Sequence, residues 1–498
     1  MLVRKSLVFI VLILCVAPTI TAQTVSSRLV DAKTQKGIPY ATIQYGENKG
    51  VITNAEGHFS FILEKDSLTI DSVYISSLGY EKIGFTLEQL QDSVITVQPK
   101  NIKLAGVYVF DKELSVEQIL ENMKANLDKN HRDIHLKKRF FLRQSYHDKL
   151  FKSEVTFKKS TIEEIDKDLI DSTMSLIPKA SSYYTETLGD LYLNPNKEEG
   201  NKLTIIKAAE LYNKDNEVSL EAIQEKFNQI LEKNLKQDSY LKIKSGWFST
   251  KVEVDSILEN TEEAELSEET TEPEKTNFLP NRKRTLRTMH QRMWSKKTNL
   301  DVIKKSKNYD FALKGYNEVQ GEGVYVLEFA PKGGADFTGT LYVNVNDFAI
   351  MRIDYTNVKA LRNFKLLGIS NKSHTYKGTT VYSKTKQGPY TLRFANFTYG
   401  NTVGVDRPLK IVEKNKNVKG RRKQNELRVN IDFVNNHFSQ YELVIYDIDE
   451  SGKSIYDGVT EDKTIKPTYL PAYDPSFWAG YTIMEPNQAI REFTAEGE

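Results

Sequence analysis

The stretch Gly50–Phe61, GVITNAEGHFSF, decides how the first part of this chain folds. Val51 and Ile52 are β-branched, and such side chains pack well on a pleated strand. Asn54 and Gly57 follow, and both residue types adopt the backbone of a tight turn at little cost. The stretch therefore predicts a strand that ends in a tight turn.

A second strand is predicted directly after this turn. Phe59 and Phe61 recur with a period of two, as expected when one face of a strand is buried. A similar pattern returns at Ser76–Glu81, SSLGYE, where Gly79 ends a short strand and Tyr80 follows it. The first part of the chain is therefore expected to be a small β-sandwich.

The order of motifs from Val25 to Val109 resembles the carboxypeptidase-regulatory-like domain, a seven-stranded prealbumin-type sandwich of many Gram-negative envelope proteins. Two positions depart from the family pattern, since Ser27 or Arg28 replaces a glycine and Asn54 replaces an aspartate. The resemblance implies that Thr53, Asn54, Gly57, Phe59, Gly79 and Tyr80 form the structural turn motif of this domain. The matching positions are Val30, Asp31, Pro39, Ala41, Ile43, Thr53, Gly57, Phe59, Ser76, Gly79, Tyr80 and Leu104.

Length, composition and net charge limit the classes of protein to which the chain can belong. The 498 residues suffice for roughly two to four domains. A hydrophobic fraction of 39% with 27% charged residues is typical of a folded water-soluble chain. The net charge of +2 is too small to favour nucleic acid as a partner.

Residues 1–22 are expected to be a signal peptide. Arg4 and Lys5 form a positive start, and Leu7–Val16 is an apolar run too short for a permanent membrane anchor. Cleavage is expected after Ala22. The mature protein is therefore expected in the periplasm or at the outer membrane.

The only cysteine, Cys15, lies within the apolar run, and Leu14 before it argues against lipidation. A mature chain without cysteine has no disulfide, no thiolate metal site and no thiol catalysis. No later stretch reaches the roughly 20 apolar residues of a membrane helix.

The chain is expected to divide into a β-sandwich over 23–110 and a larger domain of helices and antiparallel sheet over 111–258 and 282–498. Ser115 and Gln118 have the spacing of a capping box before an amphipathic helix over residues 116–127. The run that follows alternates like a strand and is expected to turn near His147–Leu150. The fold class is thus mainly β with some α, with a large curved sheet, in one reading a half-barrel.

Further elements follow from the periodicity. Helices are expected over residues 166–176 and 220–231, and strands over 182–192, 203–211, 240–244 and 250–255. From Tyr309 the pattern is a meander of strands, with a tight hairpin through Asn346 and Asp347. The tail PTYLPAYDPSFWAGY is expected to strap across the larger body as an extended segment.

Two neighbouring segments differ sharply in charge. Residues 259–281 begin with a dense acidic run that has almost no apolar residue, and are expected to form a disordered loop. The basic run Arg282–Lys297 predicts a helix with its apolar residues on one face and its arginines and lysines on the other. That apolar face is expected to contain Leu286, Met289, Met293 and Trp294.

The larger part resembles, more faintly, a family of envelope proteins that carry the same regulatory-like domain in front. The features shared with this family are VEQILENM, FFLRQ, GTLYVNV with AIMRIDY, and PSFWAGY. The layout of sheet and helices is also similar to the open half-barrels that carry lipoproteins or lipids in the periplasm.

Catalytic and metal patterns are weak. No histidine among 58, 131, 135, 147, 290, 374 and 437 has a glutamate three residues later, as a zinc carboxypeptidase requires. His131 and His135 have the spacing of a helical metal pair, but a solvated loop is favoured. The pairs Ser239–Lys242 and Ser383–Lys386 lie in strand patterns, where both side chains of a pair face opposite sides.

The basic segments Arg282–Lys297 and Lys419–Lys423 could bind anionic lipid headgroups, although a solvated face is favoured for both.

Two functions remain. The first is a non-enzymatic exported envelope protein, in which the sandwich is a docking module and the β-rich body binds a partner or ligand. The alternative is a periplasmic lipid or lipoprotein carrier with an apolar groove in a half-barrel. Neither needs a cofactor, a catalytic residue or a metal, and the expected partner is an envelope protein or a lipid.

Overall fold

The computed structural model describes residues 23–46, 49–63, 72–90, 94–100, 114–196, 198–236, 238–246, 248–254, 276–293, 298–415, 417, 419–420, 422–450 and 452–495. The chain forms two compact units. Unit 1 comprises Met1–Pro99 and Pro475–Glu485, and unit 2 comprises Lys100–Asp474 and Pro486–Glu498. The expected signal peptide lies outside the described residues.

Unit 1 contains two small sheets around a shared core. One sheet has the order β4-β1-β7 and the other the order β3-β2-β5-β6. Phe59 and Phe61 are fully buried, and the Phe61 ring stacks on Tyr45 with centroids 4.4 Å apart. The strands are β1 (Gln23–Asp31), β2 (Thr42–Gln44), β3 (Gly50–Ile52), β4 (His58–Leu63), β5 (Val73–Ser76), β6 (Ile83–Phe85) and β7 (Val94–Val97), with the short helix α2 (Leu87–Leu90).

The turn between β3 and β4 is held by buried polar side chains. The Thr53 hydroxyl donates to the Ile38 carbonyl at 2.8 Å and accepts from the Ala41 N–H at 2.9 Å. The Asn54 side-chain oxygen accepts from the backbone N–H groups of Glu56 and His58, each at 2.9 Å. These bonds satisfy groups that burial would otherwise leave without water.

A second polar contact fixes the end of β5 in unit 1. Gly79 adopts a φ of +82°, and Tyr80 after it donates its hydroxyl to Asp31 at 2.9 Å. Burial, followed by this bond, raises the pKa of Tyr80 to about 12. The family resemblance of this unit stays a prediction.

A late segment of the chain completes unit 1. The Thr482 hydroxyl accepts from the Ile62 N–H at 3.2 Å, and the Ser60 hydroxyl donates to Glu485. Residues Pro475–Glu485 were expected in the larger body, and this expectation is wrong because the segment bonds to β4 and belongs to unit 1. Within the described residues of the same tail, β21 (Thr468–Leu470) pairs with β10 of unit 2.

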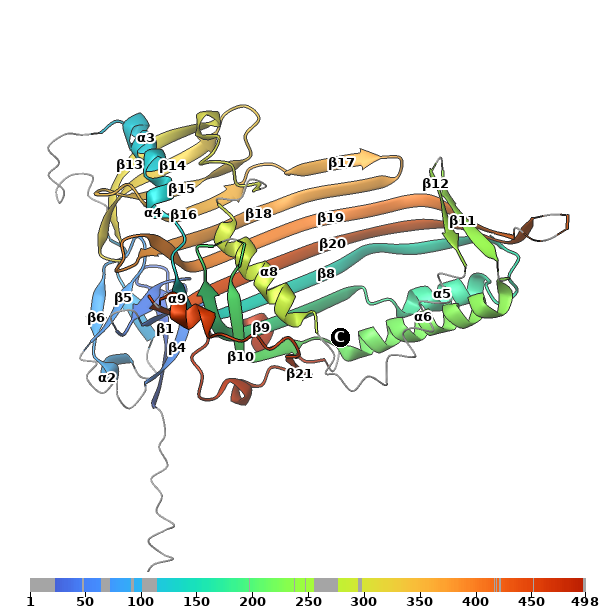
Figure 1. The fold of residues 1–498 in the computed structure, drawn as a ribbon, viewed down its shortest axis with the longest axis horizontal. Helices are drawn as coiled ribbons and strands as arrows, with labels where there is room; N and C mark the ends of the chain where they lie inside the picture. The colour runs from blue at the N-terminus through green and yellow to red at the C-terminus, as the bar shows by residue number, and fades with distance from the viewer. Residues whose placement is uncertain are drawn as a thin grey trace, which may run out of the picture. The chain divides into compact units, whose positions relative to one another are not determined.

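Unit 2 is built on a 14-stranded sheet whose main path runs β13-β14-β15-β16-β18-β19-β20-β8-β9-β10-β21 (Figure 1). Three strands lie beside this path: β11 pairs with β19, β12 pairs with β11, and β17 pairs with β18. The other strands are β8 (Leu136–Ser160), β9 (Ala180–Leu193), β10 (Lys202–Leu211), β11 (Ser239–Ser245), β12 (Phe248–Glu253), β13 (Tyr309–Val319), β14 (Glu322–Pro331), β15 (Phe337–Asn344), β16 (Ile350–Asn357), β17 (Arg362–Leu366), β18 (Ile369–Lys384), β19 (Tyr390–Asn415) and β20 (Lys423–Asp449).

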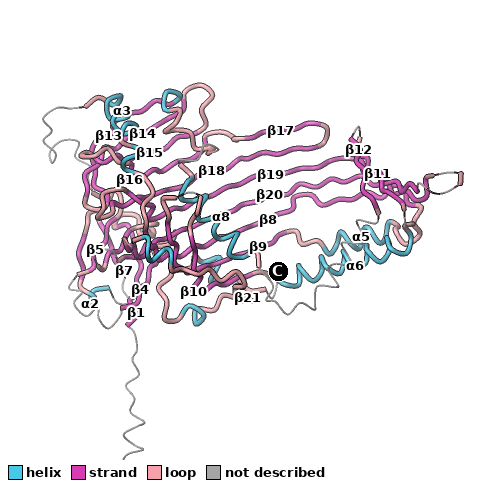
Figure 2. The backbone as a smooth tube through the Cα atoms, viewed as in Figure 1, coloured by secondary structure: helices cyan, strands magenta, loops and turns pink. Residues whose placement is uncertain are grey.

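Three neighbouring strands of this sheet are unusually long. β8, β19 and β20 have 25, 26 and 27 residues, and β20 pairs antiparallel with both of the others (Figure 2). Among the described residues the terminal strands β13 and β21 do not pair with each other, so the sheet is open. The expected mainly β fold with a large sheet and packed helices is confirmed.

The helices of unit 2 largely match the sequence. The capping box is present, since the Ser115 hydroxyl accepts from the Gln118 N–H and the Gln118 side chain accepts from the Ser115 N–H. The helices are α3 (Val116–Ala125), α4 (Leu127–Asn130), α5 (Lys167–Leu176), α6 (Lys214–Asn234), α8 (Phe278–Gln291), α9 (Lys453–Asp457) and α10 (Gln488–Arg491), with 3-10 turns η3 (Ser306–Asn308) and η4 (Pro475–Trp478), the latter in unit 1.

Two further expectations are wrong. No turn occurs at His147–Leu150, because β8 continues through it and absorbs one extra residue as a bulge near Phe151. The end of the expected disordered loop is ordered, because Thr276 bonds to the Lys463 and Ile465 carbonyls and α8 begins at Phe278. The rest of that loop, 259–275, lies outside the described residues.

The substitution Gly57→Ala tests the turn of unit 1. Gly57 has a φ of +85°, and an added Cβ would lie 2.3 Å from the Leu29 carbonyl oxygen. We expect Gly57→Ala to lower the free energy of unfolding by about 3 kcal/mol. Gly79→Ala is the control, since φ is +82° there but no described heavy atom lies within 4 Å; about 1 kcal/mol is expected. Equal losses in denaturant unfolding would contradict the close contact.

Candidate ligand-binding face

One face of the unit 2 sheet carries helix α8 (Figure 1). Successive side chains of a strand point to opposite faces, and directly paired residues share a face. Gln144 pairs with Thr185 on β9 and with Tyr441 on β20, and Tyr441 pairs with Phe397 on β19. Because Arg282 of α8 bonds to Gln144, these residues lie on the face under the helix, which we call the α8 face.

A continuous row of aromatic rings crosses the α8 face. Neighbouring ring centroids are between 4.7 and 6.2 Å apart. Burial is the largest cause that raises the pKa of Tyr146, Tyr183 and Tyr355, so these hydroxyls stay neutral. This aromatic ladder consists of Tyr469, Tyr212, Tyr183, Tyr146, Tyr441, Phe397, Tyr376, Tyr355 and Phe337.

Two arginines from α8 and the turn after it rest on the ladder. Arg282 is buried, bonds to Gln144 and donates to the Thr185 hydroxyl at 3.4 Å. The Arg292 guanidinium carbon lies 3.2 Å from the centroid of Phe397, and its Nη1 donates to the Tyr376 hydroxyl at 3.0 Å. A guanidinium over an aromatic face contributes about 0.5–2 kcal/mol.

A buried lysine and histidine hold the other part of α8. Lys138 on β8 is fully buried, with Nζ 3.2 Å from the Leu392 carbonyl and 3.3 Å from His290 Nε2. His290 Nδ1 lies 2.9 Å from the Leu286 carbonyl, so Nδ1 carries the proton and Nε2 accepts from Lys138. Burial lowers the pKa of Lys138 to about 7, and burial with the nearby Lys138 lowers that of His290 to about 3.

Farther along the strands, the same face presents apolar side chains that are only partly covered. Leu366 on β17 pairs with Ile369 on β18, Ile369 with Val405 on β19, and Val405 with Phe433 on β20. Leu366 is 57% exposed and Ile369 38%, and the other two are half-buried. We call these four residues the apolar band.

Helices α5 and α6 cover the far end of the α8 face. Val155 and Phe157 on β8 pack against a cluster that includes Ile165, Leu169 and Ile230. In Figure 1, α8 crosses in front of the sheet, whereas the α5–α6 pair lies beside the far part of β8. Along β20, Phe433 of the apolar band lies between Tyr441, opposite Gln144, and Val429, opposite Phe157.

The opposite face of the central strands carries ion pairs, one of which is fully buried. Arg143 bonds to Glu186 at 2.6 Å and pairs across the strands with Glu442 on its other side. Arg139 bonds to Asp190 at 2.5 Å. Arg143 neutralises Glu186 inside the protein, whereas the Arg139 side chain is 41% exposed beside the buried Asp190. Both arginines thus stabilise carboxylates of this face.

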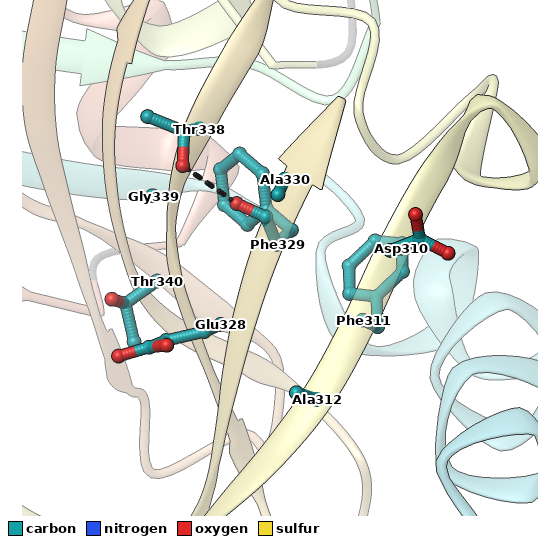
Figure 3. Close-up of a pocket in the computed structure, with 9 residues that line it drawn as sticks. All are labelled: Asp310, Phe311, Ala312, Glu328, Phe329, Ala330, Thr338, Gly339 and Thr340. Carbon is teal, nitrogen blue, oxygen red and sulfur yellow. Dashed lines mark hydrogen bonds between the residues drawn. The ribbon is translucent and has the colours of Figure 1, made fainter. Parts of the chain in front are cut away.

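A separate pocket of about 470 Å³ lies on β13, β14 and β15 (Figure 3). Its two carboxylates are already ion-paired at the surface, Asp310 with Lys332 at 2.9 Å and Glu328 with Lys314 at 3.0 Å. The Thr338 hydroxyl donates to the Phe329 carbonyl at 2.9 Å, as Figure 3 shows.

The two histidines with helical metal spacing do not form a site. His131 accepts from the Ile350 N–H at 3.2 Å and contacts Tyr382 edge-on, and burial lowers its pKa to about 4. His135 lies instead beside Tyr456. The solvated loop expected for His131 is wrong, because its ring packs under β16 and β18. Within the described ranges no cluster of three or more His, Cys, Asp or Glu could hold a metal ion.

The remaining sequence candidates occupy separate places. Ser239 is buried and donates to Glu413 at 2.8 Å, away from Lys242 on the strand's other side. Thr53, Asn54 and Gly57 form the unit 1 turn and carry no reactive arrangement. Lys419 is exposed, as favoured.

Arg282 is the residue that the sequence analysis misplaced. It was expected on the solvated side of its helix, but it shares the buried stripe with Leu286 and Met289. Its spacing of four and seven residues from them was the available signal, since such positions lie on one helical face. Of the helices expected over residues 116–127 and 220–231, neither lies on the aromatic ladder: α3 contacts β13, and α6 packs with α5 at the far end of the α8 face.

No family model and no curated protein matches the chain. Among solved structures, a LolA superfamily protein from Nitrosomonas europaea has 9% identity, with 69% of this chain and 98% of that chain covered and a TM-score of 0.16. Pseudomonas aeruginosa MucB in complex with MucA has 6% identity, with 66% and 98% covered and a TM-score of 0.16. A DUF1329 family protein from Desulfovibrio piger has 11% identity, with 66% and 92% covered and the same score. Likenesses at this score establish neither a shared fold nor a shared function.

None of the helices in the described part of the chain combines the length and the apolar character needed to cross a bilayer.

The substitution Lys138→Met tests whether the buried Lys138, which contacts His290 of α8, makes folding stability depend on pH. The pKa of Lys138 is lowered from 10.5 to about 7 in the folded protein, so between these values the unfolded chain binds more protons. Folding stability therefore rises with pH in this window, by up to about 1.4 kcal/mol per pH unit from this group. We expect Lys138→Met to be the more stable protein at pH 7, with the difference narrowing by pH 9. If the free energy of unfolding of both proteins changed with pH in the same way, the lowered pKa of Lys138 would be excluded.

Proposed function

We propose that the chain is an exported, non-enzymatic binding protein of the cell envelope, and that unit 2 carries an acyl-chain ligand on the α8 face. The observation that carries the proposal is the apolar band, a row of partly exposed apolar side chains in direct cross-strand register. Folded proteins seldom leave a contiguous apolar surface uncovered unless it binds something.

The dimensions of the band suit an extended hydrocarbon chain. Neighbouring strands lie about 4.8 Å apart, so the band from β17 to β20 spans about 14 Å. Each methylene removed from water contributes about 0.8 kcal/mol, and eight of them would contribute about 6 kcal/mol. The packed helices α8 and α5 lie on the same face, on either side of this stretch.

Polar groups next to the band could receive a ligand's polar end. His437 Nδ1 lies 3.0 Å from Asp148 Oδ1, and the Asn435 side chain donates to the same oxygen at 2.7 Å. Tyr146 of the aromatic ladder lies beside His437, with ring centroids 6.2 Å apart. An acyl chain lying across the strands on the apolar band would have its polar end near β20, where Asn435 and His437 follow Phe433 on the same face.

The proposal assigns unit 1 the role of a docking module, as its family resemblance implies. The expected signal peptide is the reason to place the protein in the periplasm or at the outer membrane. The non-enzymatic part is supported by the described acids and histidines that serve packing and ion pairs, such as Glu186 with Arg143 and His131 with Ile350.

The protein purified from its own host, without detergent, tests the function by native mass spectrometry. We expect a lipid mass bound to the unchanged chain. Phe433→Asp places a charge in the apolar band, and we expect it to lose the lipid and to bind a fluorescent fatty acid at least about tenfold more weakly.

Val434→Asp is the matched control, because Val434 is the next residue on β20 and is also partly exposed, but faces the other side of the sheet. It is expected to keep the lipid. A lipid-free mass for the unchanged chain, or equal loss in both variants, would rule out carriage on this face. A protein partner in place of lipid would then support the docking function alone.

A further inference from the structure

The hairpin of β17 and β18 combines exposed apolar residues with positive charge alone. Between Asp354 and Asp406 the sequence contains no acidic residue. The same stretch contains Lys359, Arg362, Lys365, Lys372, Lys377, Lys384, Lys386 and Arg393. The hairpin itself therefore carries only positive charge, with exposed Asp406 of β19 as the carboxylate next to its turn.

Several of these charges are free in the structure. Arg362, Lys365, Lys372 and Lys377 are exposed, and no carboxylate in the described part of the chain forms a salt bridge with them. Lys359 and Lys384, by contrast, pair with Asp336 and Asp347. The unpaired cations therefore gather on the hairpin itself.

The tip of the hairpin carries an apolar residue at a turn position that a polar residue such as Asn would occupy with less strain. Leu366 pairs with Ile369, so Leu367 and Gly368 form a two-residue turn with φ values of +50° and +76°. Turns of this kind favour Asn-Gly, because a leucine at positive φ is strained. Leu367 is nevertheless 53% exposed, beside Leu366 at 57%.

The neighbouring backbone keeps this turn in place. The Asp406 N–H donates to the Gly368 carbonyl at 2.7 Å. A Cβ at Gly368 would lie 1.9 Å from the Asp406 carbonyl oxygen, so the turn lies directly against β19. The contact with β19 therefore holds Leu366 and Leu367 in a fixed position.

We propose that the β17–β18 hairpin docks the protein onto a bilayer that carries anionic headgroups. Leu367 at the turn enters the interface, and Arg362, Lys365 and Lys372 bind the headgroup phosphates. Apolar insertion together with a basic patch is the pair of signals that gives stable attachment to a lipid surface.

An added strand from a protein is the other occupant that an edge strand could take. β17 pairs only with β18 in the described sheet, so its outer edge is open. However, lysines on an edge strand disfavour the addition of another strand, and the turn residue Leu367 would not contact one. The observations therefore favour the lipid surface.

Flotation of the full-length protein with vesicles tests the proposal. We expect binding to phosphatidylcholine vesicles that contain phosphatidylglycerol, weak binding to pure phosphatidylcholine, and a loss of binding as salt is raised. Leu367→Asn suits the turn and should leave the fold intact or stabilise it, while weakening vesicle binding about tenfold.

The double variant Lys365→Gln with Lys372→Gln is expected to weaken binding about fivefold for each lysine. Lys158→Gln with Lys159→Gln, an equal loss of charge from exposed positions of β8, is the control and should bind as the unchanged chain does. No binding by the unchanged chain, or unchanged binding by Leu367→Asn, would overturn the proposal.

None of these substitutions alters the apolar band, so the lipid seen by native mass spectrometry should persist in all of them. Loss of vesicle binding with retained lipid separates membrane docking from ligand carriage, and each can fail without the other.

Discussion

The long in-register pairing of β8, β19 and β20 is the constraint on which unit 2 depends. β20 pairs with β8 over 22 residues and with β19 over 20, which fixes the paired side chains to one face or the other. A slip of one residue would exchange the two faces. The aromatic ladder, the buried arginine pairs and the apolar band all inherit their positions from this register.

The length of these strands also explains why part of the sheet is not fully covered. α8 reaches only the ladder, and α5 with α6 covers only the region around Val155 and Phe157. Strands of ordinary length, about five or six residues, would end under a single helix. Here the strands continue between the two coverings, and Val405 and Phe433 remain half-exposed there. The open stretch is therefore a consequence of strand length.

Local signals in the sequence predicted local structure well. The capping box at Ser115 and Gln118 needs only residues three apart, so its geometry follows from the helix itself. The turn expected at His147–Leu150 failed because its polar residues resemble a loop, whereas both neighbouring strands hold that segment extended. Arg282 failed for a related reason, since its acceptor Gln144 lies on a strand 138 residues away. Contacts between distant segments decide such positions.

The arginines and lysines of this chain have two different roles, one in the buried part of the fold and one at the exposed surface. Arg143 and Lys138 are buried, where a carboxylate, a carbonyl or a neutral histidine must satisfy each cation. Arg362 and Lys365 stay in water beside exposed leucines. A buried cation is costly unless its partners are fixed, so the first pair constrains the fold. An exposed cation contributes little to stability, so its arrangement beside apolar residues is free to serve binding. That difference is why the β17–β18 hairpin, and not the buried pairs, is the part of unit 2 suited to a charged surface.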